Sequence, residues 1–147
     1  MSQLSLNPCK KVFVVGCGLM GAGITQVVAQ AGLEVVTYDR TEADLERGRK
    51  QISKVISKKS EEEQQAILER IRFTTNMEDG KDGDLVIEAV PEKLEIKKEV
   101  FKKLDDLMKP EAILASNTSS LSIAAVSSVT KRPGKVVGLH FFSPVPV

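Results

Sequence analysis

Three closely spaced glycines follow the first apolar run of the chain. The run at 11–15 reads Lys-Val-Phe-Val-Val, and Gly16, Gly18 and Gly21 come directly after it, at the start of a stretch with helical character. This order predicts a strand, a tight turn and a helix, the first half of a βαβ unit whose turn can approach a phosphate closely. The first glycine permits the turn, the second leaves room for a pyrophosphate, and the third lets the helix pack closely on the sheet.

One acidic residue, Asp39, stands at the end of the second apolar run. In such a unit this carboxylate accepts hydrogen bonds from both hydroxyls of the adenine ribose and repels a 2′-phosphate, which favours NAD over NADP. Arg40 leaves an alternative open, because its guanidinium either accommodates a phosphate or simply faces solvent at the start of a loop. The groups expected around the phosphates are the main-chain amides of Gly16, Gly18, Leu19, Met20 and Gly21.

The strand-like segments are continuous runs of Val, Ile and Leu with almost no alternation. Such runs are typical of strands buried on both faces, as in a parallel sheet covered by helices. They lie at 11–16, 34–39, 84–90, 112–116 and 135–139, with a weaker one at 72–75. Helical patterns lie at 19–31, 42–58, 61–70 and 94–108. The order predicts an α/β fold of the Rossmann type, a doubly wound, mainly parallel sheet with a helical hairpin inserted after the second strand.

Two helices are expected between the second and third strands, where one crossover helix is usual. Ser60 and Glu63 have the spacing of a capping box, so a helix begins again at this point after a short break. Lys54, Lys58 and Lys59 lie around that break. These lysines either bind a ligand or are exposed on a solvated pair of helices.

Length, composition and charge fit one ordinary globular domain. The 147 residues are 41% hydrophobic and 28% charged, and 21 Lys and Arg against 20 Asp and Glu leave a net charge of +1. This balance gives no broad electrostatic case for a nucleic acid or a membrane as a partner. Cys9 and Cys17 are too few for a disulfide framework and suit a reducing compartment. Residues 1–11 lack the features of a signal peptide, so we expect a cytoplasmic protein, and no bound metal is expected.

The one histidine, His140, directly follows the strand-like run at 135–139. The carboxyl ends of strands in an open α/β sheet face the crevice where ligands bind. A neutral imidazole there can take the proton from a substrate hydroxyl while hydride leaves the same carbon for a nicotinamide. The alternative is a histidine that is simply hydrogen-bonded near the edge of the sheet.

Polar side chains also follow the two preceding strands. Residues 116–120, Ser-Asn-Thr-Ser-Ser, either bind a ligand oxygen or cap the helix expected from about Ser122. Glu88 and Glu92 flank the end of another strand, where one of them can reach the cofactor riboses; otherwise they belong to a solvated helix N-terminus. Lys97 interrupts the apolar face of the helix that follows.

Four segments together resemble a known enzyme family. They are GCGLMGAG at 16–23, IEAVPE at 87–92, ASNTSS at 115–120 and GLHFF at 138–142. In this order, over 10–147, they are similar to the NAD-binding domain of the 3-hydroxyacyl-CoA dehydrogenases, closest to the stand-alone 3-hydroxybutyryl-CoA type. The resemblance implies NAD as the cofactor and oxidation of an (S)-3-hydroxyacyl-CoA to the 3-oxoacyl-CoA, a reaction of fatty-acid metabolism and β-oxidation.

The resemblance also implies residue roles. His140 would be the general base, and Ser119 would hold the C3 oxygen of the substrate beside the nicotinamide. The remaining positions near the cofactor would be Asp39, Glu92, Lys97, Ser119 and Ser143, and the CoA phosphates would be met by Lys54, Lys58 and Lys59.

The chain departs from the family pattern in two places. Ser143 stands where the family usually has an asparagine, and its side chain has less reach toward the nicotinamide. The glutamate that partners the histidine, and the helical C-terminal domain that covers the acyl group and forms the dimer, both lie past Val147. We therefore expect 1–147 to be an NAD-binding domain with poor turnover, because losing an orienting carboxylate costs on the order of 10⁴ in rate. Apolar surface near Phe141 and Phe142 offers another route to a homo-oligomer.

Two alternative functions remain. The first is a non-catalytic NAD-binding or interaction module, whose biological activity would be unchanged by His140→Ala and Ser119→Ala. The second is a β-hydroxyacid dehydrogenase domain that does not use CoA. The helical hairpin and the His-Phe-Phe motif disfavour this second alternative.

Overall fold

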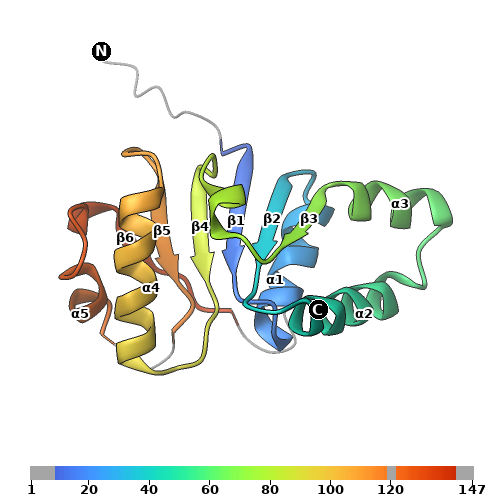
Figure 1. The fold of residues 1–147 in the computed structure, drawn as a ribbon. Coiled ribbons are helices and arrows are strands. Elements are labelled where there is room, and N and C mark those ends of the chain that lie inside the picture. The colour runs from blue at the N-terminus through green and yellow to red at the C-terminus, as the bar shows by residue number, and fades with distance from the viewer. Residues whose placement is uncertain (1–8, 119–121, 142–147) are drawn as a thin grey trace, which may run out of the picture.

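A six-stranded parallel sheet with helices on both faces forms the centre of the computed structural model, which describes residues 9–118 and 122–141 (Figure 1). The strands are β1 (Lys11–Val15), β2 (Glu34–Tyr38), β3 (Ile71–Thr74), β4 (Leu85–Glu88), β5 (Ile113–Ser116) and β6 (Val136–Gly138). The helices are α1 (Leu19–Gln30), α2 (Glu42–Ile56), α3 (Glu61–Glu69), α4 (Leu94–Leu107) and α5 (Ile123–Ser127). Two short 3₁₀ segments are η1 (Met77–Gly80) and η2 (Pro133–Lys135).

The strand order β3-β2-β1-β4-β5-β6 shows that the sheet is doubly wound. The chain adds strands outward from β1 to β3, crosses back, and then adds β4, β5 and β6 on the other side. Helices α1, α2 and α3 cover one face of the sheet, and α4 and α5 cover the other (Figure 1). The expected α/β fold of the Rossmann type is confirmed, and its reversal point lies between β1 and β4.

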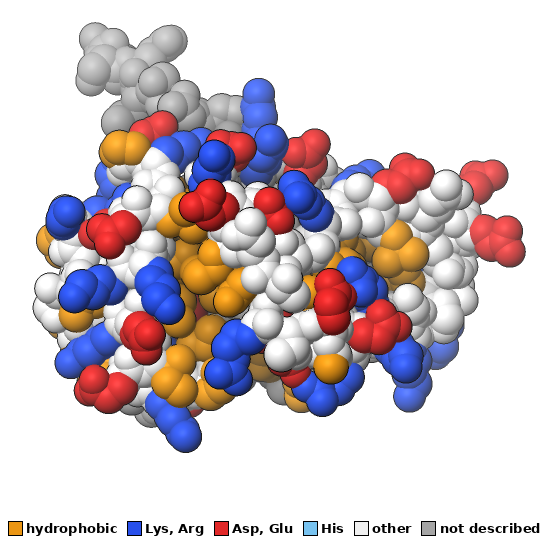
Figure 2. Space-filling view, in the orientation of Figure 1, with side chains coloured by type: hydrophobic (Ala, Val, Ile, Leu, Met, Phe, Trp, Pro, Cys, Tyr) orange, Lys and Arg blue, Asp and Glu red, His pale blue; other side chains and the backbone are white. Residues whose placement is uncertain are grey.

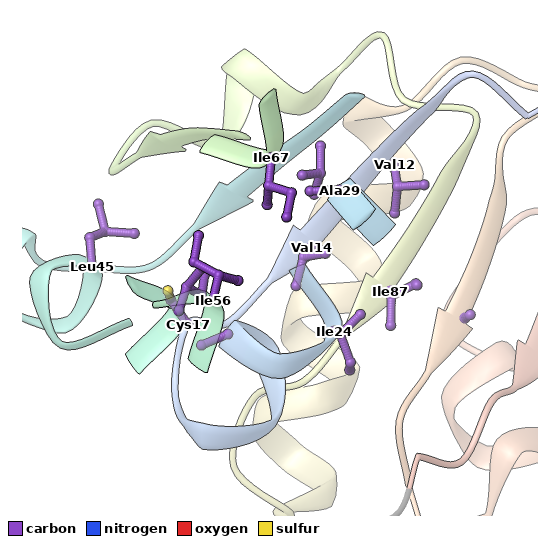
Figure 3. Close-up of a cluster of buried hydrophobic side chains, with 13 residues drawn as sticks. Val12, Val14, Cys17, Ile24, Ala29, Leu45, Ile56, Ile67 and Ile87 are labelled. Carbon is purple, nitrogen blue, oxygen red and sulfur yellow. The ribbon is translucent and has the colours of Figure 1, made fainter. Parts of the chain in front are cut away.

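Strand β1 explains why the apolar runs lack alternation. Its residues point in turn to opposite faces, and both faces are covered. Val12 and Val14 pack with Ile24 of α1 in one core cluster (Figure 3), whereas Phe13 and Val15 pack in a second cluster beneath α4 and α5. Each of these five side chains is at most 2% exposed. A strand in this position is selected for hydrophobicity at every residue.

The inserted helical hairpin is also confirmed. Helix α2 begins after Thr41, whose side chain accepts the backbone N–H of Asp44. Helix α3 begins after Ser60, whose Oγ accepts the N–H of Glu63 at 3.2 Å. The capping signal therefore marks a true second helix between β2 and β3. Ser122 caps α5 in the same way, by accepting the N–H of Ala125.

The structure shortens the strands expected at 84–90 and 135–139, which become β4 and β6, and adds two elements. The run at 84–90 leaves the sheet after Glu88, because the Glu88 carboxylate accepts the N–H of Val90 at 2.8 Å and turns the chain. Segments η1 and η2 are too short to show a helical period in the sequence. Among the described residues, no helix is long and apolar enough to cross a membrane.

Candidate functional site

The carboxyl ends of five strands lie in one row, at the lower edge of the sheet in Figure 1. The register of the sheet aligns their last residues, which are Tyr38, Val15, Glu88, Ser116 and Gly138. Consequently the segments that follow them meet at this edge, although they lie far apart in the sequence. The residues directly after the five strand ends are Asp39, Gly16, Ala89, Asn117 and Leu139.

The three glycines of the first turn meet three different constraints. Gly16 has a φ of +110°, and a Cβ there would lie 2.7 Å from the carbonyl oxygen of Ala89. A Cβ on Gly21 would overlap the carbonyl oxygen of Gly16, so this glycine lets α1 approach the turn. A Cβ on Gly18 would meet nothing within 4 Å. Gly16 and Gly21 are thus required by the fold, whereas Gly18 faces open space that a ligand can fill.

The N-terminus of α1 opens onto this space. Gly18 is its N-cap residue, no side chain caps the helix, and Leu19 in its first turn is 65% exposed. The first backbone N–H groups of a helix have no partner within the helix, and they carry the positive end of its dipole. Unlike Thr41 and Ser60 at the next two helices, Gly18 leaves these groups to an external acceptor.

Asp39 stands beside the turn in a fixed orientation. Its Oδ2 accepts the N–H of Cys17 at 2.8 Å, and its Oδ1 accepts the N–H of Arg40 at 2.7 Å. A hollow of about 190 Å³ lies between Asp39, the glycine turn and α2. Its lining residues are Cys17, Gly18, Leu19, Asp39, Asp44, Arg47, Gly48 and Gln51. Arg40 is exposed and does not line this hollow.

Cys17 is a packing residue of the turn. A Cβ on Gly48 would overlap its Sγ, so the absence of a side chain at Gly48 lets α2 pack directly against the thiol. Burial, reinforced by the nearby Asp39 carboxylate, raises the pKa of Cys17 to about 12. The thiol is therefore protonated at neutral pH and is a poor nucleophile.

Glu88, the last residue of β4, forms a buried ion pair with Lys97 of α4. Both side chains are 0% exposed, and Lys97 Nζ lies 2.7 and 2.9 Å from the two carboxylate oxygens. Ser116 Oγ donates a further hydrogen bond to Glu88 at 2.7 Å. The solvated alternative for Glu88 is therefore wrong. Lys97 fits among the apolar residues of α4 because its charge is neutralised inside the protein.

Glu92 connects this buried pair with the surface. It is 39% exposed on its side chain, and one of its oxygens lies 3.7 Å from Lys97 Nζ. Thr118 Oγ1 donates a hydrogen bond to Glu92 at 2.6 Å. The resemblance implies that Asp39, Glu92 and Lys97 meet the cofactor riboses; of the last two, Glu92 presents surface, whereas the buried Lys97 lies behind it.

His140 lies at the same edge of the sheet, two residues past the end of β6, and it is exposed. Asn117 reaches this segment, because its Oδ1 accepts the N–H of Phe141 at 3.1 Å. The polar run at 116–120 signalled a site, but nothing in the sequence showed that Asn117 contacts the histidine segment. Ser119 and Ser143 lie outside the described residues.

The hairpin lysines lie further along the same side of the molecule as the hollow. Lys54 is exposed in the last turn of α2, and Lys58 and Lys59 follow it in the connection to α3. Six residues of helix separate Gly48, which lines the hollow, from Lys54, a rise of about 9 Å. This spacing lets one extended ligand span both regions.

Charges on the outer face of α4 are mixed. Figure 2 shows Lys and Arg side chains interspersed with Asp and Glu around a hydrophobic band, with no field of one sign. Across 9–118 and 122–141, no group of three or more His, Cys, Asp and Glu side chains is placed to hold a metal ion.

Comparison with known proteins finds matches along nearly the whole chain. Residues 11–147 match the family model described as 3-hydroxyacyl-CoA dehydrogenase, NAD binding domain. A probable 3-hydroxybutyryl-CoA dehydrogenase of Deinococcus radiodurans is 44% identical over 93% of this chain and 51% of that protein. A 3-hydroxybutyryl-CoA dehydrogenase of Clostridioides difficile is 46% identical, with the same two shares.

Solved structures show the same relationship. The crystal structure of (S)-3-hydroxybutyryl-CoA dehydrogenase from Ralstonia eutropha superposes with a TM-score of 0.91 at 38% identity. The match covers 95% of this chain and 52% of that one. The chain thus spans about half the length of the relatives that it matches.

Proposed function

Because the chain belongs to the 3-hydroxyacyl-CoA dehydrogenase family, as its NAD-binding domain, we propose that it serves the oxidation of an (S)-3-hydroxyacyl-CoA to the 3-oxoacyl-CoA. The observation that carries the proposal is the open cradle over Gly18, with Asp39 fixed on one side and the segment of His140 along the same edge. These residues fit NAD, because a pyrophosphate needs a turn without a Cβ and an adenine ribose needs a carboxylate acceptor.

The main-chain amides of the first turn and of α1 are proposed to hold the pyrophosphate. They belong to Gly18, Leu19, Met20 and Gly21, whereas the N–H of Gly16 donates to the carbonyl oxygen of Tyr38 at 2.8 Å and Gly16 shapes the turn beside the cofactor. Asp39 accepts hydrogen bonds from the adenine ribose, and its negative charge disfavours the 2′-phosphate of NADP. Glu92 meets the second ribose, with Lys97 behind it holding Glu92 in place at 3.7 Å.

His140 is proposed as the general base. Its imidazole takes the proton from the C3 hydroxyl of the substrate, and Ser119 holds that oxygen by a hydrogen bond. A bound nicotinamide supplies the acceptor for the hydride that leaves C3. Ser143 is proposed to lie near the nicotinamide amide. The role of His140 requires a neutral imidazole before the reaction.

The lysines of the hairpin are proposed to bind the phosphates of CoA. Lys54, Lys58 and Lys59 lie where the end of α2 meets the connection to α3. Ammonium groups at a helix end form charge-assisted hydrogen bonds with phosphate oxygens. This assignment separates a CoA-dependent enzyme from a β-hydroxyacid dehydrogenase that uses free acids.

Calorimetric titration with NADH tests the cofactor site. Gly18→Val should weaken binding by about tenfold or more, because the new side chain fills the space of the pyrophosphate. Gly134→Val is the matched control: a Cβ on Gly134 also meets nothing within 4 Å, but η2 lies at the opposite end of β6. Absence of both heat and a thermal shift with saturating NADH in the unaltered chain would refute the proposal.

Binding of acetoacetyl-CoA tests the substrate class. Lys54→Gln, Lys58→Gln and Lys59→Gln together should weaken it by roughly fivefold or more, because three ammonium groups are lost. The control carries the same three changes at the exposed Lys81, Lys102 and Lys103. Equal affinities for the two triple variants would favour a domain that does not use CoA.

Measuring turnover tests whether residues 1–147 are catalytically active on their own. We expect residues 1–147 alone to oxidise NADH with acetoacetyl-CoA slowly or not detectably, because the resemblance places the orienting carboxylate of the histidine outside them. Any residual activity should disappear in His140→Ala. Turnover that persists unchanged in His140→Ala would refute the role of His140 as the base, whereas NADH binding without any turnover would favour the non-catalytic NAD-binding module.

The cellular setting belongs to the same proposal. An acyl-CoA substrate places the protein in fatty-acid metabolism, and β-oxidation uses this reaction. Two free cysteines, Cys9 and Cys17, are compatible with the reducing cytoplasm. A homo-oligomer through the apolar surface near Phe141 remains part of the proposal.

A further inference from the structure

Asn117 joins three segments that are distant in the sequence. Its backbone N–H donates to the carbonyl oxygen of Glu88 at 2.9 Å, at the end of β4. Its carbonyl oxygen accepts a hydrogen bond from Lys97 Nζ of α4 at 3.2 Å. Its side-chain Oδ1 accepts the N–H of Phe141, past the end of β6, at 3.1 Å. Both main-chain groups and the side chain of one residue are thus used to connect β4, α4 and the segment after β6.

The inner side of this connection is firmly held. Glu88 and Lys97 are each 0% exposed, and each makes further hydrogen bonds within the protein. A buried ion pair with its hydrogen bonds satisfied cannot shift without exposing a charge to an apolar environment. The backbone of Asn117 is therefore a fixed point from which its side chain reaches outward.

The outer side carries His140. Before it, the N–H of Leu139 donates to the carbonyl oxygen of Ser116 at 3.0 Å, which is the last ladder bond of β6. After it, the N–H of Phe141 donates to Asn117 Oδ1. His140 thus lies between two residues whose N–H groups donate to Ser116 and Asn117, at the end of β5. The acceptor of the first bond is a backbone carbonyl, and the acceptor of the second is a side chain.

We propose that Asn117 is a positioning residue for His140. Its amide oxygen extends the β5–β6 ladder by one bond, so the main chain that carries the imidazole stays aligned with the cofactor edge. The chemistry assigned to His140 rests on the proposed function, but the placement of its main chain does not. A single hydrogen bond of this kind favours the held arrangement by roughly twofold to tenfold.

The single histidine of the sequence makes the test direct. In the chain without an affinity tag, the imidazole protons give one set of NMR signals, and these report on His140 alone. Asn117→Ala removes the acceptor of the Phe141 N–H. We expect the His140 signals to shift in the free chain, and their displacement by saturating NADH to fall by at least about twofold.

Asn76→Ala is the matched control. Asn76 Oδ1 also accepts one backbone N–H, that of Glu78, at 3.1 Å, but it caps η1 after β3, at the opposite edge of the sheet from β6 and His140. It should lower the midpoint of thermal unfolding as Asn117→Ala does and leave the His140 signals in place. Asn117→Asp keeps an acceptor oxygen at the same reach and should restore the displacement by NADH, with the free-state signals shifted by its charge. Should Asn117→Ala fail to fold, Asn117→Ser, which is too short to reach Phe141, replaces it.

The outcomes separate the two proposals. Unchanged His140 signals and an unchanged NADH displacement in Asn117→Ala, or in Asn117→Ser, would overturn the positioning role while leaving NAD binding intact. Shifted signals in the free Asn117→Ala variant, absent from Asn76→Ala, would support it even if calorimetry found no NADH binding to the unaltered chain. That last result would count against the proposed function alone.

Discussion

Glu88 and Lys97 bring two charges into a part of the protein with no exposed surface. Lys97 Nζ donates to both carboxylate oxygens and to the carbonyl oxygen of Asn117, and Glu88 also accepts from Ser116 Oγ and from the N–H of Val90. Each charge therefore has several partners in place of water. A buried pair of this kind contributes little net stability, but each charge depends on the presence of the other.

Removing one charge should cost more than removing both. Lys97→Met leaves an unpaired buried carboxylate, and we expect it to lower the free energy of unfolding by about 3–5 kcal/mol. The double variant Glu88→Gln with Lys97→Met should lose clearly less, because neither charge remains. Urea unfolding of the two single variants and the double variant measures the coupling. A Lys97→Met variant as stable as the unaltered chain would contradict this description.

Asp84 fixes the opposite end of the sheet. Its carboxylate accepts Lys109 Nζ and the backbone N–H groups of Lys10 and Lys11, so it holds the start of β1 beside β4. The hydrogen bond from Lys109, followed by those from the two backbone N–H groups, lowers the pKa of Asp84 to about 2. An aspartate with a lowered pKa stabilises the folded state above its unfolded pKa near 3.9, and the contribution is lost as the pH falls toward 2.

Asp84→Asn should therefore show a pH-dependent loss of stability. At pH 7 we expect a loss of about 1 kcal/mol, less than the full shift in pKa implies, because the side chain is 29% exposed and solvent screens the interaction. The difference from the unaltered chain should shrink between about pH 4 and pH 2. Denaturant unfolding across this range measures it, with the exposed Asp106→Asn as control. A constant difference at every pH would show that the carboxylate charge is not responsible.

At the scale of single residues, the sequence showed which positions carry chemistry but not which ones meet. The glycine spacing identified Gly16, Gly18 and Gly21, because the fold requires Gly16 and Gly21 and the close approach of a ligand requires Gly18. The pair of Glu88 and Lys97 could not be predicted in the same way, because the contact forms only when α4 folds back over β4. A glutamate inside an apolar run, followed by a lysine on the apolar face of a helix, is the signal that such a pair leaves in a sequence.

At the scale of elements, the C-terminus of α4 depends on one distant arginine. The Nε–H of Arg132, a residue beside η2, donates a hydrogen bond to Asp105 Oδ1 at 2.7 Å. The two terminal nitrogens of the same guanidinium donate to four carbonyl oxygens. Those oxygens belong to Asp105, Met108, Lys109 and Ala112. The last carbonyl groups of a helix have no partner within it, so the guanidinium closes α4 and joins it to the start of β5.

Arg132→Lys keeps the charge but loses the planar fork of donors. We expect it to lower the free energy of unfolding by about 2–4 kcal/mol, because an ammonium cannot reach four carbonyl groups in two directions. Arg72→Lys is the control, since Arg72 is 65% exposed and makes one ion pair, with Asp79. Urea unfolding compares the two variants, and equal losses would show that the fork geometry is unimportant.

The elements themselves were largely predictable, for a physical reason. Strands covered on both faces are mostly apolar, so β1, β2 and β5 stand out as nearly continuous runs, with Thr37 and Ser116 as their buried polar residues. The capping serine at Ser60 separated α2 from α3. The end of β4 was not predictable, because the side chain of Glu88 turns the chain at Val90 while the sequence remains apolar.

At the scale of the whole molecule, cofactor binding should stabilise the fold. NADH at one hundred times its dissociation constant adds about 2.7 kcal/mol, which raises the midpoint of thermal unfolding by roughly 5–10 °C for a domain of this size. NADPH should give a smaller rise, because Asp39 repels the 2′-phosphate. Differential scanning calorimetry measures both rises. A rise that persists in Gly18→Val would place the bound nucleotide elsewhere.

Strand β1 occupies the middle of the sheet, paired with β2 on one side and β4 on the other. On the ribosome, β1 emerges first, and its second neighbour is complete only with Glu88. The fifty residues between Tyr38 and Glu88 take roughly 3–10 s to synthesise. During that time, one edge of a valine-rich strand is open to pairing with other nascent chains. Among the described strands, β1 is thus the one whose second neighbour is synthesised latest after it, because of its central place in the finished sheet.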